Sequence, residues 1–167
     1  PSYAPGLLGH GEGVTRLNTP TRLPSPLGGE RAASVSAGVG HSLALTADGA
    51  VWSWGSGGYG KLGHGDDQNQ LLPKKIEAFA GQRVVAVSAG ATHSLALAAD
   101  GSVWSWGYGS SRQLGHGDTP NEYGEAHGQS QWLPKKGEAL AGRRVIAVSA
   151  GSGYSLALTA DGSVWSW

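Results

Sequence analysis

The sequence repeats itself three times, and this repetition limits what the chain can fold into. Val-Ser-Ala-Gly begins at residues 35, 87 and 148, and Ser-Leu-Ala-Leu follows at residues 42, 94 and 155. Ala-Asp-Gly and then Val-Trp-Ser-Trp complete each copy in the same order. A fixed period of this size is typical of arrays in which each repeat forms one supersecondary unit that packs against its neighbours.

Asp48, Asp100 and Asp161 occupy equivalent positions, separated by 52 and 61 residues. The second spacing is longer because nine extra residues lie between Asp118 and Leu133. On this frame we expect repeat 1 at 1–48 without its first strand, repeat 2 at 49–100, repeat 3 at 101–161 with a loop insertion at 119–132, and the start of a further repeat at 162–167. Residues 162–167 and 1–48 would together make one more unit.

Each unit is predicted to be built from short β-strands. Two apolar runs, 43–46 and 51–54, flank the dipeptide Asp48-Gly49. Asp-Gly between apolar runs indicates a tight hairpin, usually one whose two loop residues both have positive φ. Residues 74–79 are the only stretch with even a weak helical pattern. Several short strands repeated with a period near 52 are typical of propeller blades.

The composition excludes several classes of protein. The 12 Lys and Arg residues balance the 12 Asp and Glu residues, which argues against direct nucleic-acid binding because such proteins carry a basic patch. No apolar run approaches the roughly 18 residues of a membrane span, so no membrane partner is expected. The absence of Cys excludes disulfides and thiolate metal sites.

The order of the motifs, together with Tyr-Gly-Lys-Leu-Gly-His-Gly-Asp at residues 59–66, resembles the repeat of the regulator of chromosome condensation family. The resemblance covers nearly all of the chain. It implies an all-β fold, a partial β-propeller of about three four-stranded blades, as a segment of a seven-bladed propeller. Since 167 residues cannot close such a ring, we expect either a segment of a longer protein or head-to-tail self-association of two copies into six blades.

The resemblance implies the fold more firmly than the function, because one scaffold can host unrelated sites. Family members include an exchange factor for a nuclear-transport GTPase, partner modules of HECT-type ubiquitin ligases, a plant ultraviolet photoreceptor and a secreted bacterial inhibitor. The photoreceptors carry Gly-Trp-Arg-His-Thr runs, and the matching stretches here, such as 38–42, lack the Trp-Arg pair. Light sensing is therefore not expected.

We expect a non-catalytic protein-interaction scaffold that binds a protein partner and needs no cofactor. One alternative is a guanine-nucleotide exchange factor for a small GTPase. A second is the substrate- or partner-recognition module of a HECT-type ubiquitin ligase, which would bind a ubiquitin-pathway protein. A third is a secreted inhibitor or lectin-like binder. No nucleophile motif, phosphate loop or distinctive acid pair supports catalysis.

The candidate binding residues fall into two groups. Loops on rigid scaffolds often carry recognition, and the insertion contains Tyr123, His127 and Trp132. Two basic pairs recur in corresponding places and could contact acidic partner surfaces: Lys74, Lys75, Lys135 and Lys136. The repeated Trp pairs are expected to pack between blades. The His-x-Asp pairs His64/Asp66 and His116/Asp118 are expected to shape turns rather than to bind metal, because equivalent positions are spread around a ring.

Overall fold

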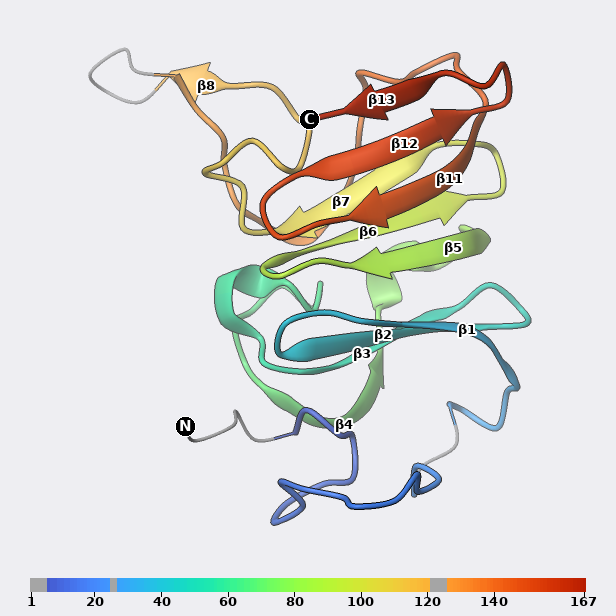
Figure 1. Ribbon diagram of the computed structural model, residues 1–167, viewed down its shortest axis with the longest axis vertical. Coiled ribbons are helices and arrows are strands. Elements are labelled where there is room, and N and C mark those ends of the chain that lie inside the picture. The colour runs from blue at the N-terminus through green and yellow to red at the C-terminus, as the bar shows by residue number, and fades with distance from the viewer. Residues whose placement is uncertain (1–5, 25–26, 121–125) are drawn as a thin grey trace.

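The computed structural model describes residues 6–24, 27–120 and 126–167. Three antiparallel sheets stand side by side in a stack, with the N-terminal segment against the first sheet and the last sheet at the opposite end (Figure 1). This arrangement confirms the all-β, partial-propeller fold. Within the described ranges, no helix combines the length and apolar character needed to cross a bilayer.

Two of the three sheets, or blades, have four strands. Blade 1 has the order β1-β2-β3-β4 and comprises β1 (Ala32–Ala37), β2 (His41–Thr46), β3 (Val51–Gly55) and β4 (Gln70–Lys75). Blade 2 has the order β5-β6-β7-β10 and comprises β5 (Val84–Ala89), β6 (His93–Ala98), β7 (Val103–Gly107) and β10 (Gln131–Lys136).

Blade 3 has three strands in the described part of the chain, β11 (Val145–Ala150), β12 (Ser155–Thr159) and β13 (Val164–Ser166). The insertion adds a short ribbon of β8 (Thr119–Pro120) and β9 (Ala126–His127). Two single turns of 3-10 helix, η1 (Gly58–Gly60) and η2 (Glu77–Phe79), follow β3 and β4. The weak helical pattern at 74–79 is therefore split between the end of β4 and η2.

The hairpin turns differ from the tight turn expected for Asp-Gly. Gly49 has φ 91°, but no Asp appears among the positive-φ residues of the described ranges. The Gly49 N–H donates to the Thr46 carbonyl, so Ala47 and Asp48 form the centre of the turn and Gly49 follows it. This is the longer hairpin in which a type I turn is followed by a left-handed glycine. The Asp48 carboxylate favours it by accepting the Thr46 hydroxyl at 2.5 Å.

The apolar core lies between blades rather than inside one blade. The cluster between blades 1 and 2 is anchored by Trp106, which is fully buried, and by Phe79, whose ring meets it edge-on at 5.7 Å. Between blades 2 and 3, Trp165 and Trp167 pack against a second buried cluster. Trp54 packs with Leu27 on the outer side of blade 1. The Trp pairs of blades 2 and 3 therefore pack at blade junctions, as expected, whereas Trp52 and Trp54 of blade 1 pack with the N-terminal segment.

Backbone hydrogen bonds also join the blades along the turns after their first strands. The Val39 N–H donates to the Gly90 carbonyl at 3.1 Å, and the Ala91 N–H donates to the Gly151 carbonyl at 3.3 Å. The closeness of these turns leaves no room for a side chain at Gly38. A methyl group there would overlap the Gly90 carbonyl oxygen and lie 2.7 Å from Cε1 of His41.

We therefore expect Gly38→Ala to lower the free energy of unfolding by about 1–3 kcal/mol, the usual cost of forcing extra atoms into a packed site. Gly153→Ala is the matched control, because a methyl group at Gly153 meets nothing within 4 Å. Urea unfolding of the two variants checks the prediction. Equal stabilities for G38A and G153A would contradict it.

Candidate functional site: the hairpin end of the blades

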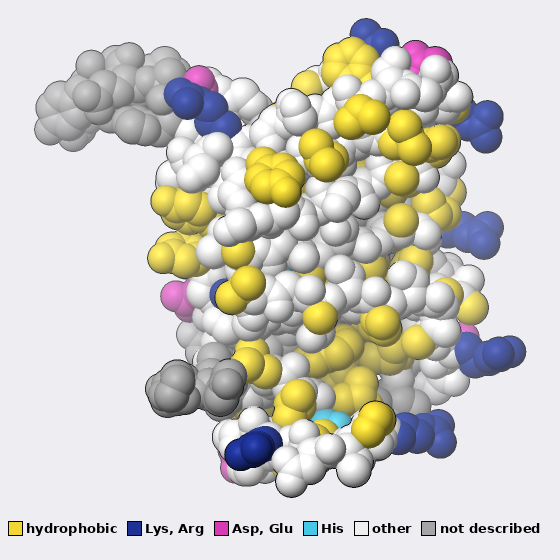
Figure 2. Space-filling view, viewed as in Figure 1, with side chains coloured by type: hydrophobic (Ala, Val, Ile, Leu, Met, Phe, Trp, Pro, Cys, Tyr) yellow, Lys and Arg dark blue, Asp and Glu magenta, His cyan; other side chains and the backbone are white. Residues whose placement is uncertain are grey.

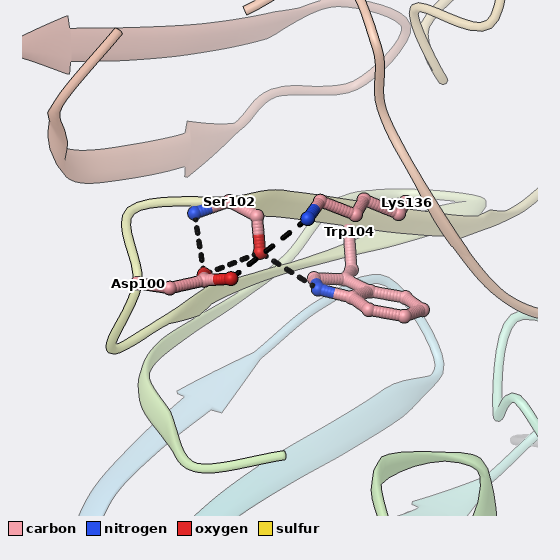
Figure 3. Close-up of polar contacts among 4 residues, drawn as sticks. All are labelled: Asp100, Ser102, Trp104 and Lys136. Carbon is pink, nitrogen blue, oxygen red and sulfur yellow. Dashed lines mark hydrogen bonds and ion pairs between the residues drawn. The ribbon is translucent and has the colours of Figure 1, made fainter. Parts of the chain in front are cut away.

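One end of every blade carries a hairpin whose Asp is held by local hydrogen bonds. In blade 2, Asp100 Oδ1 accepts the Ser102 hydroxyl at 2.6 Å and the Ser102 backbone N–H at 2.9 Å. These bonds, and then the nearby charge of Lys136, lower the pKa of Asp100. Lys136 Nζ lies 3.8 Å from Asp100 Oδ2, so the outer strand β10 brings a lysine to the hairpin (Figure 3).

The blades use different residues for the same hairpin geometry. Blade 2 has Ala98 where blade 1 has Thr46, so Ser102 supplies the hydroxyl that Thr46 supplies to Asp48. The Ser102 hydroxyl also accepts the Trp104 Nε1–H at 3.2 Å (Figure 3). In blade 1 the counterpart of Ser102 is Ala50, and Trp52 Nε1 has no hydrogen-bond partner among the described residues.

The predicted lysines all lie on the outer strands and are exposed at this end. Lys74 and Lys75 end β4, and Lys135 and Lys136 end β10. The positive charge of Lys75 also helps to lower the pKa of Asp48. The structure thus brings the two pairs to equivalent positions on neighbouring blades, which is what repetition of a sequence motif produces in a stack of equivalent sheets.

The sequence reasoning missed a set of arginines at the same end. Arg31, Arg83 and Arg144 each precede the first strand of a blade. Their backbone carbonyls accept N–H groups from the hairpin residues Ala47, Ala99 and Ala160, at 2.8–2.9 Å. Figure 2 shows Lys and Arg side chains along the side where these hairpins lie in Figure 1. Each Arg lies four residues before the recurrent Val-Ser-Ala-Gly motif, and this fixed spacing was the signal available in the sequence.

The predicted residues of the insertion are not brought together with the lysines in the described structure. Tyr123 lies outside the described residues, and His127 is described only as the last residue of β9. Trp132 lies in the outer strand β10, where its side chain is 47% exposed and its carbonyl accepts the Gly65 N–H at 3.0 Å. It is the blade 2 counterpart of Leu71, whose carbonyl accepts the Gly11 N–H.

The His-x-Asp turns hold their own blades together. His64 Nε2 lies 2.9 Å from the Ser53 hydroxyl, and His116 Nε2 lies 2.9 Å from the Ser105 hydroxyl. Burial, and then the charge of Lys74, lowers the pKa of His64 to about 4. Burial and Lys135 lower the pKa of His116 in the same way. The described residues contain no group of three or more potential His, Asp or Glu ligands close enough to hold a metal ion.

His41 and His93 link successive blades. His41 Nε2 lies 2.9 Å from the Ser94 hydroxyl of the next blade, and His93 Nε2 lies 2.9 Å from the Ser155 hydroxyl. Ser94 in turn donates to the Lys61 carbonyl at 2.9 Å. Both imidazoles are buried, and burial lowers their pKa values, to about 3 for His41 and about 4 for His93. These histidines are part of the blade junctions and are not available to a partner.

Comparison with known protein families identifies the repeat. The model of the regulator of chromosome condensation (RCC1) repeat matches residues 48–97 and 100–158, and a second RCC1-repeat model matches residues 32–61 and 84–113. The matched ranges cover each of the three blades at least in part.

Curated relatives share this similarity over nearly the whole chain. The E3 ubiquitin-protein ligase HERC2 of Homo sapiens is 39% identical over 164 residues, which are 97% of this chain and 3% of that protein. The ultraviolet-B receptor UVR8 of Arabidopsis thaliana is 32% identical and is matched over 46% of its length. The chain therefore spans less than half the length of these relatives.

Solved structures show the same fold. Prp20p of Saccharomyces cerevisiae, from a study of its binding to Gsp1p and histones, superposes with a TM-score of 0.78 at 26% identity. The match covers 99% of this chain and 40% of Prp20p. Human WBSCR16 superposes with a TM-score of 0.69 at 27% identity, over 83% of this chain and 33% of that one.

Proposed function

Because this chain belongs to the RCC1-repeat family, we propose that it is a non-catalytic protein-interaction module that binds its partner through the hairpin end of its blades. The observation that carries the proposal is the recurrence of Lys74-Lys75 and Lys135-Lys136 at equivalent exposed positions. Basic side chains at equivalent places on adjacent blades present a periodic row of positive charge, and such a row suits a partner with an extended acidic surface.

The local hydrogen bonds of the hairpins support this assignment. Asp48, Asp100 and Asp161 each accept hydrogen bonds from within their own hairpin. Their carboxylates are held at the hairpins, while the ammonium groups at the ends of the lysine side chains extend to solvent. Lys136 and Asp100 form an exposed, long pair, and exposed pairs of this kind contribute little to stability. The lysines are therefore free to exchange an intramolecular contact for one with a partner.

The test is capture of partners from a lysate of the source organism by the immobilised chain. The variant K74Q/K75Q/K135Q/K136Q is compared with the wild type, and R16Q/R22Q serves as a control that removes exposed positive charge elsewhere. We expect the lysine variant to capture at most about a tenth of the amount of each specific partner that the wild type captures. A few weak charge contacts together contribute about 1.4 kcal/mol to the free energy of binding, which corresponds to a tenfold change in affinity. The control is expected to behave as the wild type.

The same capture is repeated at increasing salt. Contacts between exposed charges are screened as the Debye length shortens, so binding is expected to weaken between 0.1 and 0.5 M salt. If the lysine variant captures the same partners in the same amounts, or if salt has no effect, the hairpin end is not the binding surface.

Two more specific functions each have one observation in their favour. The similarity to HERC2, whose name is that of a ubiquitin ligase, favours a recognition module of a HECT-type ubiquitin ligase. The similarity to Prp20p, which was studied for its binding to Gsp1p, favours exchange on a small GTPase. Capture of ubiquitin-pathway proteins would support the first. Accelerated release of a fluorescent guanine nucleotide from Gsp1p would support the second.

A further inference from the structure

A polar pocket recurs at the hairpin end of both junctions between successive blades. Its volume is about 230 Å³ between blades 1 and 2 and about 310 Å³ between blades 2 and 3. Each pocket lies between a hairpin, the end of the outer strand of the same blade, and the segment that leads to the first strand of the next blade. The charged residues at corresponding places are Asp48, Lys75 and Arg83 in one pocket and Asp100, Lys136 and Arg144 in the other.

Only the second lysine of each pair lines one of these pockets. Neighbouring side chains in a strand point to opposite faces of the sheet. After the hydrogen bonds within the hairpin, the charge of Lys75 contributes to the lowered pKa of Asp48. The charge of Lys74 instead acts, after burial, on the pKa of His64. Blade 2 repeats this division, with Lys136 beside Asp100 and Lys135 near His116 (Figure 3).

The arginine of each pocket is held between two hairpins. The Arg83 carbonyl accepts the Ala99 N–H of its own blade at 2.8 Å, and Arg144 has the same hairpin contact at 2.9 Å. The residue after Arg83, Val84, donates its N–H to the Gly49 carbonyl of the preceding blade at 3.2 Å. A methyl group at Gly49 would lie 2.7 Å from Cγ of Arg83, so this side chain starts against the preceding hairpin. In the described part of the chain, neither guanidinium forms a hydrogen bond or an ion pair.

Each pocket has one more positive than negative side chain. The pocket between blades 2 and 3 also contains Arg143 and Glu138, whose charges cancel. Asp48 and Asp100 already accept hydrogen bonds from their own hairpins, whereas a lysine has three N–H donors and an arginine five. The cations therefore keep donors for another anion. One carboxylate would balance the charge of a pocket, whereas a phosphate group would bring nearly two negative charges.

We propose that each pocket binds one acidic side chain of the partner between the lysine ammonium and the arginine guanidinium, so that an acidic peptide places one carboxylate at each blade junction. This inference rests on the proposed function and adds to it the binding pocket and the chemical class of the ligand. Packed sheets lie about 10 Å apart, and an extended chain advances about 3.3–3.6 Å per residue. Acidic residues at every third position of an extended segment therefore match successive junctions.

The division of the lysine pairs provides a matched test. The probe is a fluorescein-labelled peptide with Glu at every third position and Gly or Ser at the others, and fluorescence anisotropy gives its Kd. The double variants are K75Q/K136Q, R83Q/R144Q and K74Q/K135Q. The first two each remove one cation from each pocket, and glutamine keeps the Cγ of Arg83 that lies against the hairpin. The third removes the same charge from the same strands outside the pockets and is the control.

We expect the Kd to rise about fivefold or more for the two pocket variants, because each loses two exposed charge contacts. The control is expected to change it less than about twofold, and a peptide with Gln in place of Glu is expected to bind at least about tenfold more weakly. The pockets are overturned if the wild type does not bind the Glu peptide, if the Gln peptide binds equally well, or if all three variants weaken binding equally. Equal weakening would still leave the hairpin end as a diffuse basic surface, so this failure is distinct from that of the proposed function.

Discussion

Replacing Trp106 with alanine is expected to lower the free energy of unfolding by about 3–5 kcal/mol, the range measured when a large buried aromatic side chain is truncated. Trp106 is fully buried between blades 1 and 2 and meets Phe79 edge-on. Its Nε1–H donates to the Lys61 carbonyl at 2.9 Å. The substitution therefore opens a cavity and removes a buried hydrogen bond at a junction on which both blades depend.

Trp132→Ala is the control for this experiment, because Trp132 is about half exposed on β10. Its loss is expected to change the free energy of unfolding by less than about 1 kcal/mol. Trp106→Phe separates the two contributions to the larger effect, since it keeps most of the apolar volume but lacks the N–H donor. Chemical unfolding followed by far-ultraviolet circular dichroism measures all three variants. If W106A were as stable as W132A, the junction would not be the main source of stability.

Acidification is expected to destabilise the protein between pH 6.5 and about pH 4, through His41 and His93. An unfolded histidine has a pKa near 6.5, whereas burial holds the pKa at about 3 for His41 and about 4 for His93 in the fold. In this window the unfolded chain binds protons that the folded chain does not, so the free energy of unfolding falls as the pH falls. Above about pH 7 the histidines are neutral in both states and contribute no pH dependence.

The size of the effect follows from the same difference in proton binding. Between pH 7 and pH 4.5, His41 and His93 are each expected to lower the free energy of unfolding by about 2–3 kcal/mol, because each pKa unit corresponds to about 1.4 kcal/mol. The hairpin carboxylates do not account for this loss. Their pKa values are lowered in the fold, so their contribution is lost only below about pH 4, as the pH falls from the ordinary Asp value.

Urea unfolding at pH 7.0, 6.0, 5.0 and 4.5 measures this dependence. His93→Gln is expected to be less stable than the wild type at pH 7 but to lose part of the pH dependence. The double variant H41Q/H93Q is expected to lose more of it, and the remainder comes from His64 and His116, whose pKa values are also lowered in the fold. A wild-type stability that does not change between pH 7 and 4.5, or a slope that H93Q leaves unaltered, would contradict a role of the buried imidazoles.

The repeated motifs were sufficient to predict the all-β fold and the packing of the Trp pairs of blades 2 and 3 between blades. They predicted the strands around each Asp-Gly because alternating apolar residues and a turn signal are local features. They were insufficient to predict the turn type. The Asp48 and Asp100 carboxylates accept hydrogen bonds from the Thr46 and Ser102 hydroxyls, and these bonds favour a longer turn with a single left-handed residue.

The candidate site was predicted only in part. The lysine pairs were visible in the sequence because they recur in a motif. The arginines that precede the first strand of each blade were not predicted. Nothing in the local sequence shows that the start of the first strand lies beside the hairpin that joins the second and third strands of the same blade. Trp132 was assigned to a loop, yet it lies in β10, because the sheet pairing of residues 131–136 depends on β7, more than twenty residues earlier.

The sequence by itself determined the number of units, their β character and the recurrence of the same packing residues, since each of these is a property of a short segment and its period. Only the tertiary structure decided that His41 contacts Ser94 of the next blade, and that the Lys61 carbonyl accepts hydrogen bonds from both Trp106 and Ser94. Those features depend on contacts between residues some thirty to sixty positions apart in the chain, and the free energy of such contacts is defined only once the blades are packed.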